Sequence, residues 1–181
     1  MAKLRPARSV RGIHSQAWAR YSVKKPKKNY VKSLPHTSLM IFNMGMDRPT
    51  YDTLYTLNSD QNVQLRSNSL EASRQVANKH LERELVNNYY FTVVTYPHNV
   101  IREKKRATGA GADRLSQGMS MSFGKPVSVA ARINQGTDVF EVKVIGNAAS
   151  LSVAKEALKR ASSKISGHYS IIAKPIAKKA G

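Results

Sequence analysis

The sequence predicts an α+β domain in which two helices pack on a largely antiparallel sheet. Segments with strand-like and helix-like hydrophobic periods alternate along the chain, and two of them carry a clear helical stripe. Of the 181 residues, 41% are hydrophobic, which is enough to build a core. The sequence shows no internal repeat. We therefore expect one core domain over 37–173, a basic arm over 1–36 and a basic tail over 174–181.

The first half of the predicted core places short strands before a helix. Leu39–Gly45 has the apolar composition of a strand that ends at a glycine, and a further strand is expected over 61–65. The rest of 46–66 has no readable pattern. Ser67 is the expected N-cap of a helix over 69–85. Its core stripe consists of Leu70, Ala77, Leu81 and Leu85, with Val76 on the flank.

The next segments are rich in aromatic and β-branched residues. Residues 89–96 predict a strand that ends at Pro97, and Val100 begins another. Residues 127–133 and 138–145, separated by Asn134-Gln135-Gly136, have the pattern of a β-hairpin. In the second of these strands apolar and charged residues alternate, so one face is expected to be buried and the other exposed to solvent.

The last part of the core is predicted to form a helix followed by a strand. The helix is expected to begin at Gly146-Asn147 and to end at Gly167, with a final strand over 168–172. Its core stripe is Leu151, Ala154, Leu158, Ala161 and Ile165. The opposite side is mostly basic and includes Lys155, Lys159 and Arg160.

The positive charge is concentrated in three blocks. The chain has 30 Lys and Arg against 11 Asp and Glu, a formal net charge of +19. Residues 1–46 hold ten basic residues and no acidic one, and further basic excess lies in 102–125 and 155–181. Such a chain repels itself unless a polyanion is near, and the usual polyanion is nucleic acid. The arm also carries Trp18 and Tyr21, which either stack on bases or pack back on the core.

A long loop interrupts the core at 102–117. It has basic residues on both sides of a tip of small residues, where Gly109 and Gly111 allow the backbone to approach a ligand closely. Loops of this length inside a compact domain are usually functional or disordered. The pattern predicts a flexible basic finger that reaches toward a polyanion.

The sequence gives little support for catalysis, metal binding or membrane insertion. The chain has no cysteine, its five histidines are scattered, and the glycines near 109 and 124 match neither a dinucleotide nor a P-loop motif. His80 is expected to be a packed histidine. There is no apolar run long enough for a membrane span and no signal-type N-terminus. We expect no enzyme, no cofactor, no metal, no small-molecule substrate and no membrane partner.

Several motifs stand in an order that resembles a known family. They are RPAR at 5–8, IFNMG at 41–45, LEASRQVANK at 70–79, PHNVIR at 97–102, AGADRL at 110–115, GM at 118–119 and FGKP at 123–126. Together they resemble the universal large-subunit ribosomal protein sixteen family, called ten-e in archaea and ten in eukaryotes. The chain looks most like the archaeal form, since it lacks the cysteines and the long acidic tail of the eukaryotic one.

The resemblance implies an α/β-hammerhead fold and a cytoplasmic, structural role in the large ribosomal subunit. It also implies a place near the peptidyl-transferase centre, where rRNA performs the chemistry, and a loop that points toward the acceptor end of tRNA. The expected partners are large-subunit rRNA, tRNA and neighbouring ribosomal proteins. A free-standing RNA- or DNA-binding protein, of the chaperone or nucleoid type, remains the alternative.

The predicted contacts form two groups. The tRNA-facing loop consists of Arg102, Lys104, Lys105, Arg106, Gly109, Gly111, Asp113 and Arg114. The rRNA-binding group, which would hold phosphates rather than read bases, consists of Arg5, Arg8, Arg11, Arg20, Lys24, Lys25, Lys27, Lys28, Phe123, Lys125, Lys155, Lys159 and Arg160.

Overall fold

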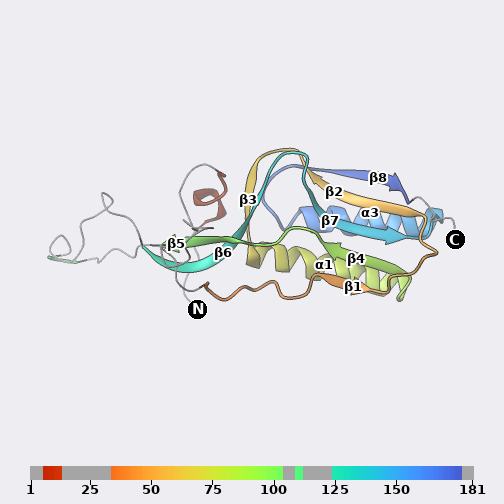
Figure 1. The fold of residues 1–181 in the computed structure, drawn as a ribbon, viewed down its shortest axis with the longest axis horizontal. Helices are drawn as coiled ribbons and strands as arrows, with labels where there is room; N and C mark the ends of the chain where they lie inside the picture. The colour runs from red at the N-terminus through yellow and green to blue at the C-terminus, as the bar shows by residue number, and fades with distance from the viewer. Residues whose placement is uncertain (1–5, 14–33, 104–108, 112–123, 177–181) are drawn as a thin grey trace, which may run out of the picture.

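The structure is a computed structural model that describes residues 6–13, 34–103, 109–111 and 124–176. Within these ranges the chain forms two antiparallel sheets, two α-helices and a short 3₁₀ helix, η1 (Ala7–Ser9). Figure 1 shows the elements and the two sheets. The predicted α+β class is confirmed, but the strands are divided between two sheets instead of one.

The larger sheet has five strands in the order β1-β4-β7-β2-β8, and each neighbouring pair is antiparallel. It lies over the helices and forms the body of the molecule. Its strands in chain order are β1 (Asn43–Gly45), β2 (Thr53–Ser59), β4 (Tyr89–Val93), β7 (Asp138–Val144) and β8 (Tyr169–Pro175).

The smaller sheet has three antiparallel strands in the order β3-β6-β5. They are β3 (Val63–Arg66), β5 (Asn99–Glu103) and β6 (Lys125–Ile133). Beyond β3, the two strands β5 and β6 continue as a two-stranded ribbon that projects from the body (Figure 1). We call this pair the β5–β6 ribbon.

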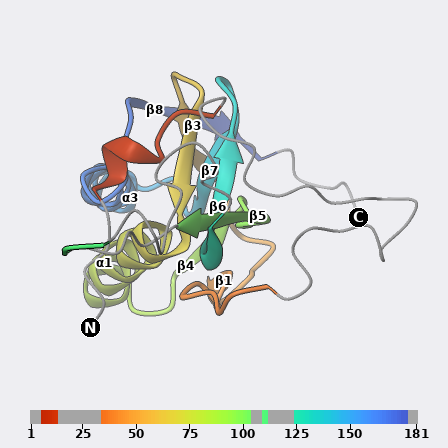
Figure 2. The same ribbon diagram turned by 90° about the vertical axis from the view of Figure 1, so that its left-hand side faces the viewer.

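The two helices, α1 (Ser67–Leu85) and α3 (Ala148–Ser162), lie side by side on the same side of the five-stranded sheet, as Figure 2 shows. The Ser73 hydroxyl joins them by donating to the Ala161 carbonyl at 2.7 Å. The predicted stripes are confirmed. Buried in the core are Leu70, Ala77, Leu81, Ala154, Leu158, Ala161 and Ile165, with Leu85 and Leu151 partly buried at its edge.

The predicted hairpin over 127–145 is wrong. β6 pairs with β3 and β5, whereas β7 pairs with β2 and β4. The chain does turn at 134–137, where the Thr137 N–H donates to the Asn134 carbonyl. However, the turn is bonded to the end of β2: the Gly136 N–H donates to the Ser59 carbonyl, and the Ser59 N–H donates to the Thr137 carbonyl. Residues 53–66 and 125–144 therefore run antiparallel to each other, and both pass from one sheet to the other at this place.

Both helix boundaries differ from the prediction. Ser67 is the first helical residue instead of the N-cap, because β3 leads directly into α1 and Arg66 takes the capping position. α3 ends at Ser162 instead of Gly167. The hydroxyls of Ser162 and Ser163 donate to the carbonyls of Lys159 and Arg160, which is how serine competes with further helical bonds.

Gly45, which ends β1, is expected to be sensitive to substitution. Its φ is +81°, and a Cβ there would overlap the Tyr89 carbonyl of β4. Gly136 has a similar φ of +84°, but nothing lies within 4 Å of a Cβ. We predict that Gly45→Ala lowers the free energy of unfolding by more than about 2 kcal/mol, whereas Gly136→Ala costs only about 1 kcal/mol. Urea unfolding followed by circular dichroism measures both, and equal losses would contradict the clash at Gly45.

Candidate nucleic-acid interface

The described N-terminal segment, residues 6–13, is attached to the edge strand β3. The Gln64 backbone N–H donates to the Arg11 carbonyl at 2.8 Å, and its side-chain amide donates to the Val10 carbonyl at 3.0 Å. Val10 packs with Ile101 and Ala130 of the β5–β6 ribbon. These contacts hold the predicted rRNA-binding residues Arg8 and Arg11 exposed at this edge of the smaller sheet.

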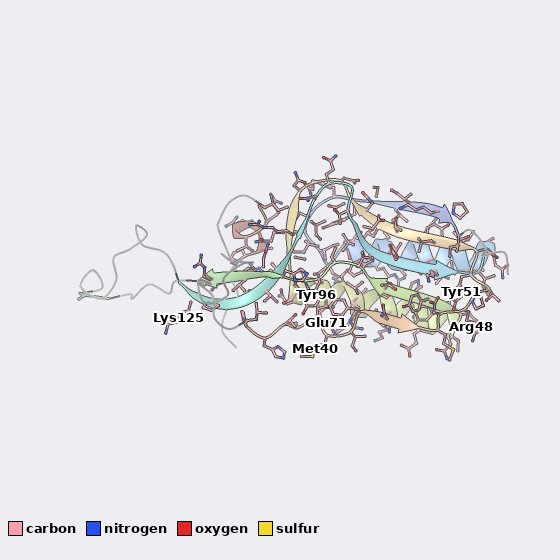
Figure 3. All side chains as sticks on the ribbon, viewed as in Figure 1. Met40, Arg48, Tyr51, Glu71, Tyr96 and Lys125 are labelled. Carbon is pink, nitrogen blue, oxygen red and sulfur yellow. The ribbon has the colours of Figure 1, made fainter. Side chains whose placement is uncertain are left out.

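The predicted basic loop joins the two strands of the β5–β6 ribbon. The pairing continues to Glu103 and Lys125, so both ends of the loop are held at the outer end of the ribbon. Figure 3 labels Lys125 there. Lys125 is exposed and Arg102 partly buried. Gly109 and Gly111 are exposed with φ of +134° and +82°, and nothing lies within 4 Å of a Cβ at either position. The described ends of the loop therefore have the placement that a projecting finger requires.

Many of the predicted contact residues lie outside the described residues. From the loop they are Lys104, Lys105, Arg106, Asp113 and Arg114, and from the rRNA-binding group Arg5, Arg20, Lys24, Lys25, Lys27, Lys28 and Phe123. Their contacts stay predictions.

The predicted basic residues of α3 are exposed, but they face two different places. Lys155 and Lys159 line a shallow groove between α3 and Ile171 of β8. The Lys155 Nζ lies 5.8 Å from the centre of the Tyr55 ring. Arg160 turns toward α1, where its Nη1 lies 3.3 Å from Nδ1 of His80. The three residues therefore do not form one continuous row.

Arg160 belongs to a second basic cluster that the sequence did not reveal. It lines a hollow of about 200 Å³ between the helices, together with Val76, Lys79, His80 and Arg83 of α1. The four-residue spacing of Lys79 and Arg83 places them on one side of α1, which was the only signal in the sequence. Two carboxylates reduce the charge here: Glu84 pairs with Arg83 at 2.6 Å and Glu156 with Arg160 at 2.9 Å.

His80 is buried, as predicted for a packed histidine. Burial lowers its pKa, and the nearby Arg160 guanidinium lowers it further. The neutral ring can then accept a hydrogen bond from Arg160 at Nδ1. This arrangement positions Arg160 between Glu156 and His80, and so links α3 to α1.

The described residues offer neither a metal cluster nor a membrane span. No group of three or more histidine and acidic side chains is placed to hold a metal ion in the described ranges. Among those residues there is also no helix that is both long and apolar enough to cross a membrane.

Comparison with known proteins gives a consistent result. Residues 19–172 match the family model described as ribosomal protein L16p/L10e. The chain belongs to this family. It is 40% identical over 152 residues to the large ribosomal subunit protein uL16 of Archaeoglobus fulgidus, which covers 83% of this chain and 86% of the relative.

Two further archaeal proteins of the same name are similar over nearly their whole length. The Halorubrum lacusprofundi protein is 40% identical over 166 residues, covering 90% of this chain and 89% of its own. The Staphylothermus marinus protein is 38% identical over 174 residues, covering 96% and 95%. The predicted family, its archaeal character and the non-enzymatic structural role in a cytoplasmic ribosome are confirmed by these matches.

The lowered pKa of His80 predicts a pH-dependent stability. The unfolded chain binds a proton at His80 near its ordinary pKa of 6.5, whereas the folded chain binds it only at lower pH. Stability should therefore fall as the pH drops below about 7, until the folded-state pKa is reached. In His80→Gln this dependence should be smaller, while His168→Gln, at an exposed histidine, should behave like the wild type. Urea unfolding at several pH values between 7.5 and 5.5 tests this. If the free energy of unfolding of His80→Gln changes with pH as steeply as that of the wild type, the prediction is wrong.

Proposed function

We propose that this chain is a structural protein of the large ribosomal subunit that binds rRNA through phosphate contacts and steadies tRNA with the loop at the end of the β5–β6 ribbon. The observation that carries the proposal is the ribbon itself. It holds both ends of the 104–124 connection away from the body, and that connection is rich in basic residues. The names of the archaeal relatives support the assignment to the large subunit.

Phosphate contact is the binding mode that the charge distribution supports. The net charge is +19, yet residues 47–101 and 126–154 are nearly neutral, and several described carboxylates are already paired with cations. The exposed cations on η1, on the ribbon and on α3 are therefore available to a polyanion on more than one side of the chain. Contacts of this kind fix position and orientation without reading sequence.

The loop is suited to a positioning role. A β-ribbon keeps its base rigid through paired backbone bonds, while glycines at 109 and 111 permit backbone conformations that other residues rarely adopt. Basic residues on such a loop would screen the phosphates of an acceptor stem. The resemblance to the ribosomal family implies a position of this loop near the peptidyl-transferase centre, where it would act on tRNA position and leave the chemistry to rRNA.

Binding to large-subunit rRNA is predicted to depend steeply on salt. If six to ten phosphates are contacted, affinity should fall by roughly 10³–10⁵ between 50 and 200 mM salt. In Lys155→Gln/Lys159→Gln the slope of log K against log salt should decrease by roughly 0.7–0.9 for each phosphate that the variant no longer neutralises. The matched control is Lys143→Gln/Lys174→Gln, which removes the same charge from lysines paired with Asp47 and Asp138.

Filter binding or fluorescence titration with the full chain measures these slopes. If the affinity of the wild type does not change with salt, phosphate contact is contradicted. If the two double variants have equal salt slopes, the lysines of α3 make no phosphate contact. Sedimentation separates the ribosomal assignment from a free-standing nucleic-acid binder. A ribosomal protein co-migrates with the large subunit at moderate salt, whereas a free binder does not.

Removal of the loop is predicted to impair tRNA handling without unfolding the chain. Residues 104–124 can be replaced by Asn-Gly, a favoured two-residue hairpin turn, because Glu103 and Lys125 are already paired. Among the described residues, the helices and sheets supply the main core cluster, so the thermal midpoint should stay within a few degrees of the wild type.

Large subunits that carry the shortened chain should bind tRNA more weakly, and their assembly should be delayed. The readouts are sucrose-gradient profiles and tRNA binding to purified subunits. Unfolding of the shortened chain, or normal tRNA binding by its subunits, would each contradict the finger role.

A further inference from the structure

An apolar hollow lies at the place where the β5–β6 ribbon joins the body. It has a volume of about 360 Å³ and is lined by residues of the segments 34–37 and 96–98 together with Val129 of β6. Figure 3 labels Tyr96 at this junction. Neither the predicted loop contacts nor the predicted rRNA contacts include any of these residues, so the hollow has no role in the function proposed above.

The hollow presents a supported aromatic ring to the solvent. Tyr96 stacks on Phe42 with ring centres 5.3 Å apart and planes 21° from parallel. The His98 ring lies 4.6 Å from Tyr96 at 47°. Tyr96 nevertheless stays 49% exposed, beside Leu34, which is 65% exposed. Exposed apolar side chains that lie together in one patch, unlike single ones, mark a surface that contacts a partner.

The charges around the hollow favour one kind of partner. The segments 34–46, 94–102 and 124–133 contain no aspartate or glutamate. The same strands carry Arg102, Lys125 and Arg132 against one carboxylate, Glu103, which lies at the outer end of β5 in register with Lys125. A hollow whose lining has an aromatic ring and no carboxylate, on a ribbon with more cations than carboxylates, suits a nucleobase, whose flat face stacks while its phosphates meet the cations.

We propose that this hollow holds an unpaired nucleobase of rRNA, stacked on the aromatic group formed by Tyr96, His98 and Phe42. The inference rests on the proposed rRNA binding and adds to it a contact of a different chemical kind. The stack on Phe42 fixes the Tyr96 ring before the base arrives, so little side-chain freedom is lost on binding. Every base has a flat face, so the site accepts an unpaired base in general and does not select one by hydrogen bonds.

The test compares the affinity and the salt slope of full-length variants on large-subunit rRNA. Stacking on an aromatic side chain contributes an amount that corresponds to about 5- to 150-fold in affinity. Tyr96→Ala should weaken binding within that range and leave the salt slope unchanged, because a stacked base releases no counterion. Tyr96→Phe should bind like the wild type. The matched control is Ile172→Ala, at an exposed apolar residue of β8, which forms the opposite edge of the larger sheet from β1.

Photocrosslinking of intact wild-type large subunits gives a second readout that needs no variant. A nucleotide adduct on the peptide that contains Tyr96 and His98 is expected. His98→Ala, at an exposed residue, keeps the affinity test valid even where Tyr96→Ala loosens Phe42, and urea unfolding shows whether it does.

The outcomes separate this inference from the function on which it rests. Wild-type affinity in both Tyr96→Ala and His98→Ala overturns the stacking site alone, and so does a crosslink of this peptide to a protein side chain. A changed salt slope in Tyr96→Ala also overturns it, because the contact would then be ionic. A wild-type chain that does not bind large-subunit rRNA overturns the proposed function and the inference together.

Discussion

The whole arrangement depends on the place where two long segments change sheets together. Residues 53–66 and 125–144 are paired on both sides of this place, and Ser59 is bonded there to both Gly136 and Thr137. Ser59 is fully buried, so its backbone groups have no water to bond and must find partners in the chain. The paired bend lets one pair of segments supply the middle of the larger sheet and also the base of the ribbon.

This bend separates the packed core from the cationic surface, which would otherwise lie close together in one charged chain. Under the helices, the five-stranded sheet buries large side chains such as Phe91 and Phe140, which pack with ring centres 5.5 Å apart. Beyond the bend, the smaller sheet carries cations at its edges. Since like charges repel each other less when they are spread apart, an extended shape lets a chain of net charge +19 keep a nearly neutral core.

The sequence predicted the elements whose signal lies within their own residues. Both helices repeat their apolar residues every three to four positions, and that period survives in the structure. It missed β2, in which Thr56 and Ser59 are polar yet fully buried. Their burial is set by β7 and β8, which lie about eighty or more residues away in the chain.

The hairpin prediction failed for the same reason, because a turn sequence shows that the chain bends but not which strand it will pair with. The cluster of Lys79, His80 and Arg160 could not be predicted from the sequence, because it forms only where two helices pack together. In contrast, the loop at 102–117 was readable as a candidate site, since its length and charge are properties of the sequence alone.

Phosphate contacts and a stacked base would have complementary effects in a large RNA. Phosphates repeat along the RNA backbone, so a purely cationic surface can bind in many registers with similar affinity. A hollow that accepts a base only where one is unpaired removes most of these registers. Because the hollow lies at the root of the β5–β6 ribbon, fixing it would also fix the direction in which the ribbon projects. The orientation of the loop would then follow from a contact made at its base, and the tip would remain able to adapt to tRNA.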